Sequence, residues 1–497
     1  MRRGRGAYAA RRPLPTTMYF IRCAILAGLA VCAPFAARAQ GAALEPCRLH
    51  GIEREVRCGR VEVAEDPDAP AGRRIAIHFA VVPALARNKL PDPVFVLAGG
   101  PGQAASRVAA QVQPVFAQLN ARRDIVYVDQ RGTGKSNALA CPPPGGTLSL
   151  AETVDLVRAT ERLAECLRKL DADLRQYATW IALRDLDAVR AALGVERINL
   201  WGGSYGTRAA LEYLRQFPKR VRAVVLDGAA PPDMALPASF AVDAEAALRR
   251  MLADCARDAD CRARHPRFDA AIDRLLASAA NGLQLTVAHP LTGRTESLRL
   301  DRAALAGLLR APLYAPPLAA VLPRALAEAA RGEFAPLVAL SASLTARVAE
   351  NFAEGMHFAV ICAEDLPRID AAALAAARAT RFGTTFVDLY RDACRHVPVR
   401  AVPAAFYEIP AVDVPVLILS GGADPATPPR HGEAVARRLP RALHLVAPNL
   451  GHGVSAQGCA PDLIVRFVRQ ASFDGIDGDC LQRLPAPLFF RPPGGDR

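Results

Sequence analysis

The chain has 497 residues, of which 51% are hydrophobic and 22% are charged, so its composition is that of a globular protein and excludes a disordered one. The formal net charge is +13, but residues 1–39 hold seven arginines and no acidic residue, which leaves only +6 for the remainder. Lys and Arg are scattered among Asp and Glu there and form no basic stripe, so we expect no nucleic-acid partner.

The first 39 residues have the pattern of a secretory signal peptide. Arginines precede the apolar run Ile25–Val31, and Ala37–Ala39 is a small-x-small cleavage site. The run is too short to span a bilayer comfortably, and no later apolar stretch of about 18 residues exists, so we expect no stable membrane insertion. A start at Met18 and a lipoprotein attached at Cys32 are alternatives. The sequence predicts a secreted or periplasmic protein.

Ten cysteines follow the predicted signal, and an even number in an oxidising compartment predicts disulfides. The sequence alone does not decide among the many possible pairings, and we expect sequential neighbours to pair. The expected bridges are Cys47–Cys58, Cys141–Cys166, Cys255–Cys261, Cys362–Cys394 and Cys459–Cys480. No Cys-x-x-Cys occurs and no histidines alternate with the cysteines at zinc spacing, so we expect neither a metal site nor a cofactor.

Two strands and a glycine-rich loop open the predicted core. Residues 73–83 alternate as a half-buried strand does, and 93–97 are a more completely apolar strand. The loop Ala98–Gly102 follows at once, and glycine permits both close approach and unusual dihedrals. The amide of Gly100 is therefore expected to lie open to a ligand, an ordinary tight turn being the alternative.

The next predicted strand, Asp124–Asp129, leads into Gln130–Ser136, which superficially suggests a phosphate-binding loop. A Walker A motif needs a glycine five residues before Gly134, and that position holds Asp129. The sequence therefore argues against a nucleotide site. Asp129 and Arg131 are expected to hold the turn through hydrogen bonds.

Helices are expected over residues 148–170 and 179–193, the second with Thr179 as its N-cap and Gly194 as its stop. A strand is expected over 221–226. Strands that alternate with helices in this way predict a mostly parallel sheet with right-handed crossovers.

The stretch Arg197–Phe217 lies between them and has the pattern of a strand, a sharp turn and a helix. At the turn, Gly202, Ser204 and Gly206 fit Gly-x-Ser-x-Gly. A serine on so tight a turn needs small neighbours, and the helix N-terminus behind it supplies N–H donors and a favourable dipole. We therefore predict that Ser204 is a nucleophile on an elbow, although a glycine-rich turn without chemistry would share the pattern. The amides of Gly100 and Tyr205 are the expected oxyanion donors.

From residue 232 to 410 the chain is rich in Ala, Leu and Arg, with helical periodicity and little strand signal. Helices are expected over 241–255, 268–276, 302–309 and 371–380. The strand pattern returns at 414–420 and 443–446, with helices over 432–439 and 461–470. We predict a core over residues 40–231 and 411–497 that is interrupted by a helical cap over 232–410.

A serine hydroxyl needs a histidine to take its proton and a carboxylate to orient that histidine. In α/β-hydrolases these partners follow in the order Ser, acid, His, each in a loop after a strand. Asp424 and His452 occupy such positions, and Asp227, also at a strand end, is the rival acid. The sequence predicts the triad Ser204, Asp424 and His452.

Together these motifs resemble the prolyl and tripeptidyl aminopeptidase branch of the α/β-hydrolases, above all its secreted tripeptidyl-aminopeptidase-like members. The resemblance rests on Leu97–Gly102, Asp129–Gly134, Gly202–Gly206, Asp424 before Thr427-Pro428, and Gly451-His452. It implies an α/β-hydrolase fold with a helical cap and a serine exopeptidase that acts near a free N-terminus. Ala98 stands where many prolyl aminopeptidases carry His, which makes strict proline specificity doubtful.

An exopeptidase needs a group that binds the substrate ammonium, and a carboxylate in the cap would do so. Ile361–Leu366 contains the Cys-x-Glu-Asp pattern that resembles stretches of the tripeptidyl-aminopeptidase-like group. The resemblance points to Glu364 first and Asp365 second, although two solvated acids in a cap loop would look the same.

We therefore expect a secreted or periplasmic serine aminopeptidase whose substrates are peptides with a free N-terminus. An esterase or lipase of the same fold is the alternative enzyme, because fold and triad do not set the acyl group. A binding protein without catalysis is the alternative of a different class. The sequence does not decide the oligomeric state, the side-chain preference or the length of the peptide released.

Overall fold

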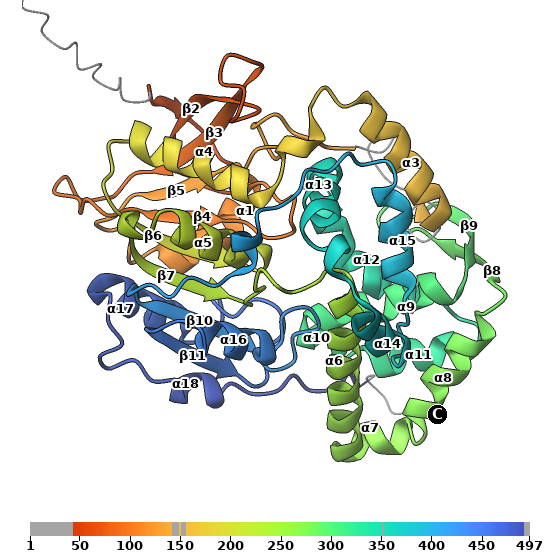
Figure 1. Cartoon of the computed structure of the whole chain (residues 1–497). Helices are drawn as coiled ribbons and strands as arrows, with labels where there is room; N and C mark the ends of the chain where they lie inside the picture. Colours follow the sequence, from red (N-terminus) through yellow and green to blue (C-terminus); the bar gives the residue numbers. More distant parts are fainter. Residues whose placement is uncertain (1–42, 142–148, 151–155, 350–351, 492–497) are drawn as a thin grey trace, which may run out of the picture. The chain divides into compact units, whose positions relative to one another are not determined.

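The computed structural model describes residues 43–141, 149–150, 156–349 and 352–491 (Figure 1). Residues 41–497 form one compact unit. The predicted signal peptide lies outside the described residues and stays a prediction.

The centre of this unit is a nine-stranded sheet in the order β1-β2-β3-β5-β4-β6-β7-β10-β11. Strands β4, β5, β6, β7, β10 and β11 run parallel, whereas β1, β2 and β3 are joined to the sheet by antiparallel pairing. The bounds are β1 Glu45–Cys47, β2 Val56–Ala64, β3 Arg74–Val82, β4 Val94–Leu97, β5 Ile125–Val128, β6 Ile198–Gly203, β7 Val221–Asp227, β10 Val416–Gly421 and β11 Ala442–Ala447. The predicted α/β class and mostly parallel sheet are confirmed.

The two faces of the sheet are buried by different helices. Val94 and Val96 of β4 pack on one side with the helices α1 (Ala105–Val112) and α17 (Ala460–Gln470). Phe95 and Leu97 pack on the other side with α4 (Thr179–Ala192), α5 (Tyr205–Gln216) and α16 (Pro429–Ala436). Successive side chains of a strand point to opposite faces, so a strand buried on both faces is apolar throughout. The apolar strand predicted over residues 93–97 has this pattern.

The start of α4 differs from the prediction. Ala178 is the N-cap and has no side-chain cap hydrogen bond, and Thr179 is the first helical residue. The amide and hydroxyl of Thr179 both donate to Glu364 instead, so a partner from a distant part of the chain replaces the expected local cap.

Between β7 and β10 the chain leaves the sheet and forms mainly helices. Figure 1 shows them, coloured from green to blue, gathered beside the sheet. They are α6 Ala238–Arg257, α7 Ala259–Arg264, α8 Phe268–Ser278, α9 Arg302–Arg310, α10 Pro316–Ala319, α11 Leu322–Ala329, α12 Ala335–Ala349, α13 Glu354–Glu364, α14 Ala371–Arg378 and α15 Thr385–Cys394. In the described part of the chain, the α-helices α3 Leu156–Lys169 and α18 Asp479–Gln482 also lie outside this insertion, and short 3-10 helices join several elements.

The insertion also contains a hairpin that the sequence did not predict, β8 (Leu283–Ala288) paired with β9 (Thr295–Leu300). Most of its side chains are exposed or only half-buried, so the apolar alternation that reveals a strand is weak there. The edge strand β1 and its neighbour β2 were also missed: β1 has only three residues, and β2 carries exposed charged residues.

All five predicted disulfides are present. They join Cys47 to Cys58, Cys141 to Cys166, Cys255 to Cys261, Cys362 to Cys394 and Cys459 to Cys480. Within the described ranges, no helix is both long and apolar enough to cross a membrane.

Candidate active site

Ser204 lies on the sharp turn between β6 and α5, in a left-handed conformation with φ 55° that L-residues rarely adopt. Its amide donates to the carbonyl of Asp227, 2.8 Å away. A Cβ on Gly202 would lie 2.3 Å from the carbonyl oxygen of Gly206, and a Cβ on Gly206 would lie 2.1 Å from that of Leu97. The turn therefore tolerates no side chain at either glycine, and the strained backbone projects Ser204 at the end of the sheet.

Asp424 and His452, from the loops after β10 and β11, are hydrogen bonded. The Nδ1–H of His452 donates to Oδ2 of Asp424 over 2.8 Å. Oδ1 of Asp424 accepts the amides of Ala426 and Thr427, and the Thr427 hydroxyl donates to Oδ2 over 2.8 Å. Both carboxylate oxygens are thus satisfied, and Nε2 is the ring nitrogen of His452 that can take a proton.

These contacts move both pKa values in the direction that a base and its orienting acid require. Burial raises the pKa of Asp424, but His452 and the amides of the loop more than offset it, so the pKa lies below its usual range. Burial lowers the pKa of His452, but the carboxylate of Asp424, followed by that of Asp227, raises it above the ordinary value.

Ser204 and His452 line the same cavity, whose volume is about 210 Å³. Its wall is largely apolar and comes from the loop after β4, the helix α1 and the loop after β11. It includes Ala98, Gly99, Gln103, Val108, Gln111, Val112, Val115, Trp201, Gly453 and Ala456. Among the described side chains no hydrogen bond joins the Ser204 hydroxyl to His452, so the predicted nucleophile and the predicted base line one cavity without a direct hydrogen bond.

Of the two predicted oxyanion donors, Tyr205 follows Ser204 directly in the chain, whereas Gly100, in the loop after β4, does not line the cavity. Tyr205 is the first residue of α5, so its amide has no acceptor within the helix. Within the described ranges, the amides of Gly100 and Tyr205 donate to no other group. Gly99 lies nearest, because a Cβ there would be 3.2 Å from the Cβ of Ser204. Gly99 lines the cavity, a position that the sequence analysis assigned to Gly100 alone.

Asp227, the rival acid, has a different set of partners. Its carboxylate accepts the amides of Val454 and Ser455 at 2.8 Å, and its carbonyl accepts the amide of Ser204. His452 donates its Nδ1–H to Asp424 and not to Asp227. Asp227 instead ties the loop that carries His452 to the turn that carries Ser204.

Two further contacts of the site were missed by the sequence analysis. The carbonyl of Tyr314 accepts the amide of His452 over 3.0 Å, and the Tyr314 ring meets the imidazole edge-on with centroids 5.2 Å apart. Tyr314 belongs to the insertion, and nothing in its local sequence connects it with a histidine 138 positions later. Thr427 appeared only within the Thr-Pro motif, and its hydroxyl bond to Asp424 had no sequence signal.

Glu364 and Asp365 are fully buried and do not line the cavity of Ser204 and His452. Glu364 accepts both the amide and the hydroxyl of Thr179, at 2.6 and 2.9 Å. Asp365 accepts two bonds from the guanidinium of Arg208, at 2.8 and 2.9 Å. The structure thus keeps both residues away from Ser204 and His452, and Glu364 is linked to the predicted site residue Tyr205 only through the Thr179 hydroxyl.

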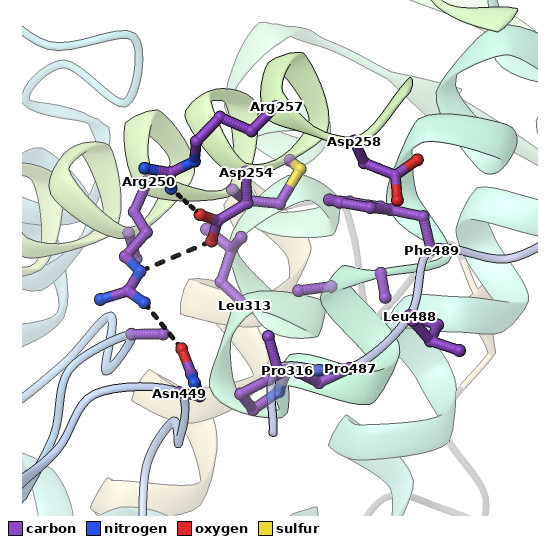
Figure 2. A pocket seen from close by; sticks show the side chains of 16 residues that line it. Arg250, Asp254, Arg257, Asp258, Leu313, Pro316, Asn449, Pro487, Leu488 and Phe489 are labelled. Carbon is purple, nitrogen blue, oxygen red and sulfur yellow. Dashed lines mark hydrogen bonds and ion pairs between the residues drawn. The ribbon is translucent and has the colours of Figure 1, made fainter. Parts of the chain in front are cut away.

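A second cavity of about 260 Å³ lies between α6, residues 313–320 and the C-terminal segment 486–489. Figure 2 shows its mostly apolar floor and the polar rim in which Asp254 pairs with both Arg250 and Arg257. Arg250 also donates to Asn449 over 3.1 Å. Neither Ser204 nor His452 lines this cavity, so it is separate from the candidate active site.

Comparisons with known proteins agree with this geometry. Residues 92–265 match the family model described as alpha/beta hydrolase fold, and residues 379–480 match the one described as TAP-like protein. Serine protease Hip1 of Mycobacterium tuberculosis is 31% identical over 44% of this chain and 45% of its own length. Tripeptidyl aminopeptidase of Streptomyces lividans is 32% identical over 41% of each chain.

These two alignments therefore cover less than half of each relative. Carboxylesterase B of Mycobacterium tuberculosis is 30% identical over 78% of each chain, which shows common descent over most of the sequence. The chain belongs to the α/β-hydrolase superfamily, in the serine hydrolase branch whose named relatives include tripeptidyl aminopeptidase.

Proposed function

We propose that this protein is a secreted or periplasmic serine exopeptidase that hydrolyses peptide bonds near a free N-terminus. The observation that supports it most is the pair of loops that brings His452 onto Asp424 beside the strained turn of Ser204. The five disulfides favour an oxidising compartment.

In the first half of the reaction, Oγ of Ser204 attacks the scissile carbonyl carbon while Nε2 of His452 takes the hydroxyl proton. Asp424 holds the imidazole with Nδ1–H toward its carboxylate and stabilises the imidazolium that forms. The amides of Gly100 and Tyr205 stabilise the negative oxygen of the tetrahedral intermediate. The intermediate collapses as His452 gives its proton to the leaving amine, which leaves an acyl-enzyme on Ser204.

In the second half, water attacks the acyl carbon and gives its proton to Nε2 of His452. The second tetrahedral intermediate expels Oγ of Ser204, which takes the proton back from His452. The products are a free acid and the regenerated hydroxyl. The chain's own residues supply every proton transfer in this cycle.

The preference for a free N-terminus rests on the TAP-like match and the peptidase-named relatives. That Glu364 and Asp365 bind the substrate ammonium stays a prediction from the sequence. In the structure a substrate ammonium would have to displace Thr179 from Glu364 or Arg208 from Asp365.

Hydrolysis of carboxylic esters is the second candidate, because a relative that aligns with 78% of this chain is named a carboxylesterase. The largely apolar wall around Ser204 would also accept the acyl chain of an ester. The same triad serves both reactions, so the structure favours neither acyl group.

The test compares three substrate classes on the purified mature protein: peptide anilides with a free amine, their N-acetylated forms, and a short-chain nitrophenyl ester. The exopeptidase predicts turnover of free-amine peptides that acetylation abolishes, and no turnover by Ser204→Ala. Ester cleavage without peptide turnover would overturn the exopeptidase and support the esterase. No turnover of any class, with no labelling by a fluorophosphonate, would support a binding protein.

A further inference from the structure

The N-terminal end of the helix α13, in the insertion, contacts the glycine-rich loop after β4. The amide of Ala353, which precedes α13, donates to the carbonyl of Gly102 over 2.9 Å. Nδ1 of His357 lies 2.9 Å from the carbonyl of Pro101, and a carbonyl only accepts, so Nδ1 carries the hydrogen. Nε2 then accepts the hydroxyl of Tyr390 over 2.8 Å.

Burial lowers the pKa of His357 to about 4, so this pattern of one donor and one acceptor persists at neutral pH. The side chain is buried, and Tyr390 holds it from the helix α15. The loop that carries Gly100 is thus fixed from the insertion by two hydrogen bonds on the carbonyls that follow Gly100.

The other end of α13 contacts the side chain of Tyr205. Glu364, its last residue, accepts the hydroxyl of Thr179, and Oγ1 of Thr179 lies 2.6 Å from the hydroxyl of Tyr205. Gln130 donates to that same Tyr205 hydroxyl over 3.0 Å. Four side chains therefore form one continuous chain of hydrogen bonds from Gln130 to Glu364.

The chain of hydrogen bonds has a direction. Gln130 donates to Tyr205, so Tyr205 can donate to Thr179 and Thr179 to Glu364 when Glu364 is ionised. A protonated Glu364 that donated to Thr179 would turn the Thr179 hydrogen toward Tyr205, whose own hydrogen would then lack an acceptor in the chain. Burial raises the pKa of Glu364 to about 8, and Arg208, 3.6 Å away, acts against that rise. The complete chain therefore belongs to the carboxylate form of Glu364.

We propose that α13 holds both halves of the oxyanion site, with His357 fixing the loop of Gly100 and Glu364 fixing Tyr205 through Thr179. Both are positioning residues, because neither touches the reacting atoms. The inference rests on the proposed oxyanion role of the Gly100 and Tyr205 amides. It makes this helix of the insertion a part of the catalytic machinery and not a lid that moves away from it.

The physical reason is the geometry that oxyanion donors must keep. They act by being fixed before the charge forms, and a displacement of about 1 Å costs on the order of a hundredfold in rate. Tyr205 is the first residue of α5, and at the start of a helix fewer backbone hydrogen bonds restrain the chain. A fully satisfied hydroxyl on its ring supplies the missing restraint.

The experiment compares Tyr205→Phe with Tyr127→Phe. Each substitution removes one buried phenol hydroxyl. The Tyr205 hydroxyl belongs to the chain of hydrogen bonds that ends at Glu364. The Tyr127 hydroxyl donates to Gln113 over 2.6 Å on the other face of the sheet. Neither change alters a backbone amide. At about pH 8.5, where Glu364 is ionised, we expect Tyr205→Phe to lower kcat about tenfold or more, with KM within about threefold, and Tyr127→Phe to leave both within about twofold.

Two further readouts separate positioning from loss of stability. A peptidyl trifluoromethyl ketone mimics the tetrahedral intermediate, so its Ki should rise by the same factor as kcat/KM falls. Thr179→Val, which keeps the backbone amide to Glu364 and removes the hydroxyl, should reproduce the effect if Tyr205→Phe does not fold. Equal effects of Tyr205→Phe and Tyr127→Phe on kcat, or an unchanged Ki, would overturn the inference.

Glu364→Gln distinguishes this inference from the predicted ammonium site. As a positioning residue, Glu364 affects the nitrophenyl ester and the free-amine peptide by the same factor. An effect on free-amine peptides with none on the ester would assign Glu364 to the ammonium and overturn the positioning role. If the protein cleaves the ester and no peptide, the exopeptidase proposal fails, but the ester rates still test the inference.

Discussion

Asp424, in a loop at the end of the sheet, and Glu364, in the insertion, are both buried carboxylates whose pKa values move in opposite directions. The pKa of Asp424 lies below its ordinary value, and that of Glu364 rises to about 8. Burial raises the pKa of both. At Asp424 the charge and hydrogen bond of His452 and the loop amides more than offset that rise, whereas at Glu364 the charge of Asp365 adds to it and Arg208 opposes it.

Asp424 follows a strand, where the chain turns and exposes backbone amides. It accepts two of these, one hydroxyl and the imidazole of His452. Glu364 is the last residue of α13, where the helix dipole is negative and disfavours a carboxylate. It accepts one amide and one hydroxyl, and Arg208 gives its own hydrogen bonds to Asp365 instead. The imidazole and the loop amides around Asp424 thus keep its pKa low, whereas Glu364, buried beside Asp365 and with fewer donors, keeps a raised pKa.

The largest effect that separates the two carboxylates is expected from Asp424→Asn. An amide at this position removes the charge that stabilises the imidazolium and favours the wrong tautomer of His452, so kcat should fall on the order of ten-thousandfold. Steady-state kinetics on the substrate that the wild type turns over best measures it. The comparison breaks if Glu364→Gln is as damaging as Asp424→Asn.

The residual activity of Asp424→Asn should also have a shifted pH profile. His452 must be neutral to act as a base, so wild-type kcat/KM falls as the pH drops through the raised pKa of His452. Because the charge of Asp424 raises that pKa, the substitution should move the acid limb to lower pH. An unmoved limb would show that another group titrates.

A large loss of stability is expected from Asp365→Asn, which lies beside Glu364. It removes the nearer of the two carboxylates beside the fully buried Arg208, Glu364 being 3.6 Å away, and breaking a buried ion pair costs about 3–5 kcal/mol. Urea unfolding measures the loss. The matched control is Asp233→Asn, which breaks a surface pair with Arg438 of equal length, 2.8 Å, and should cost less than about 1 kcal/mol. Equal losses would contradict the structural role of Asp365.

Asp227→Asn should have a smaller effect on activity. Its carboxylate orders the loop that carries His452 but makes no hydrogen bond to the imidazole, so kcat should fall about 10- to 100-fold. The charge of Asp227 raises the pKa of His452 less than the charge of Asp424 does. Asp227→Asn should therefore move the acid limb to lower pH by a smaller step than Asp424→Asn does. A fall in kcat as large as that of Asp424→Asn would restore Asp227 as the orienting acid.

The smallest expected effect compares two disulfides of the insertion. Cys362–Cys394 closes a loop of 32 residues and joins α13 to α15, whereas Cys255–Cys261 closes a loop of 6. Chain entropy predicts that replacing the first pair by serines costs about 1.5 kcal/mol more than replacing the second. Thermal or urea unfolding of the two double variants gives the difference, and the opposite order would contradict it.

The fold could be predicted, and Ser204 could be proposed as the nucleophile, because both depend on local patterns. Ser204 lies between glycines on a strand-to-helix turn, and Asp424 and His452 lie in short loops directly after apolar strands, so the backbone pattern itself indicates their positions. The sheet was predicted wherever its strands are buried on both faces. The disulfides followed the simple rule of sequential pairing.

The rest depends on contacts between distant parts of the chain, which leave no local pattern. Thr179 has the residue type of an N-cap, yet Glu364 takes both of its donors. Tyr314 meets His452 only through the packing of the insertion. The hairpin of β8 and β9 is too exposed to show an apolar alternation. Tertiary contacts therefore decided the elements that the sequence analysis missed.

The most direct test of the catalytic assignment is to locate the adduct of a fluorophosphonate by peptide mass spectrometry. The triad predicts one adduct, on Ser204, which is absent from Ser204→Ala and forms far more slowly in His452→Gln, because the serine then lacks its base. An adduct on another residue, or labelling of Ser204 that is unchanged by His452→Gln, would contradict the account.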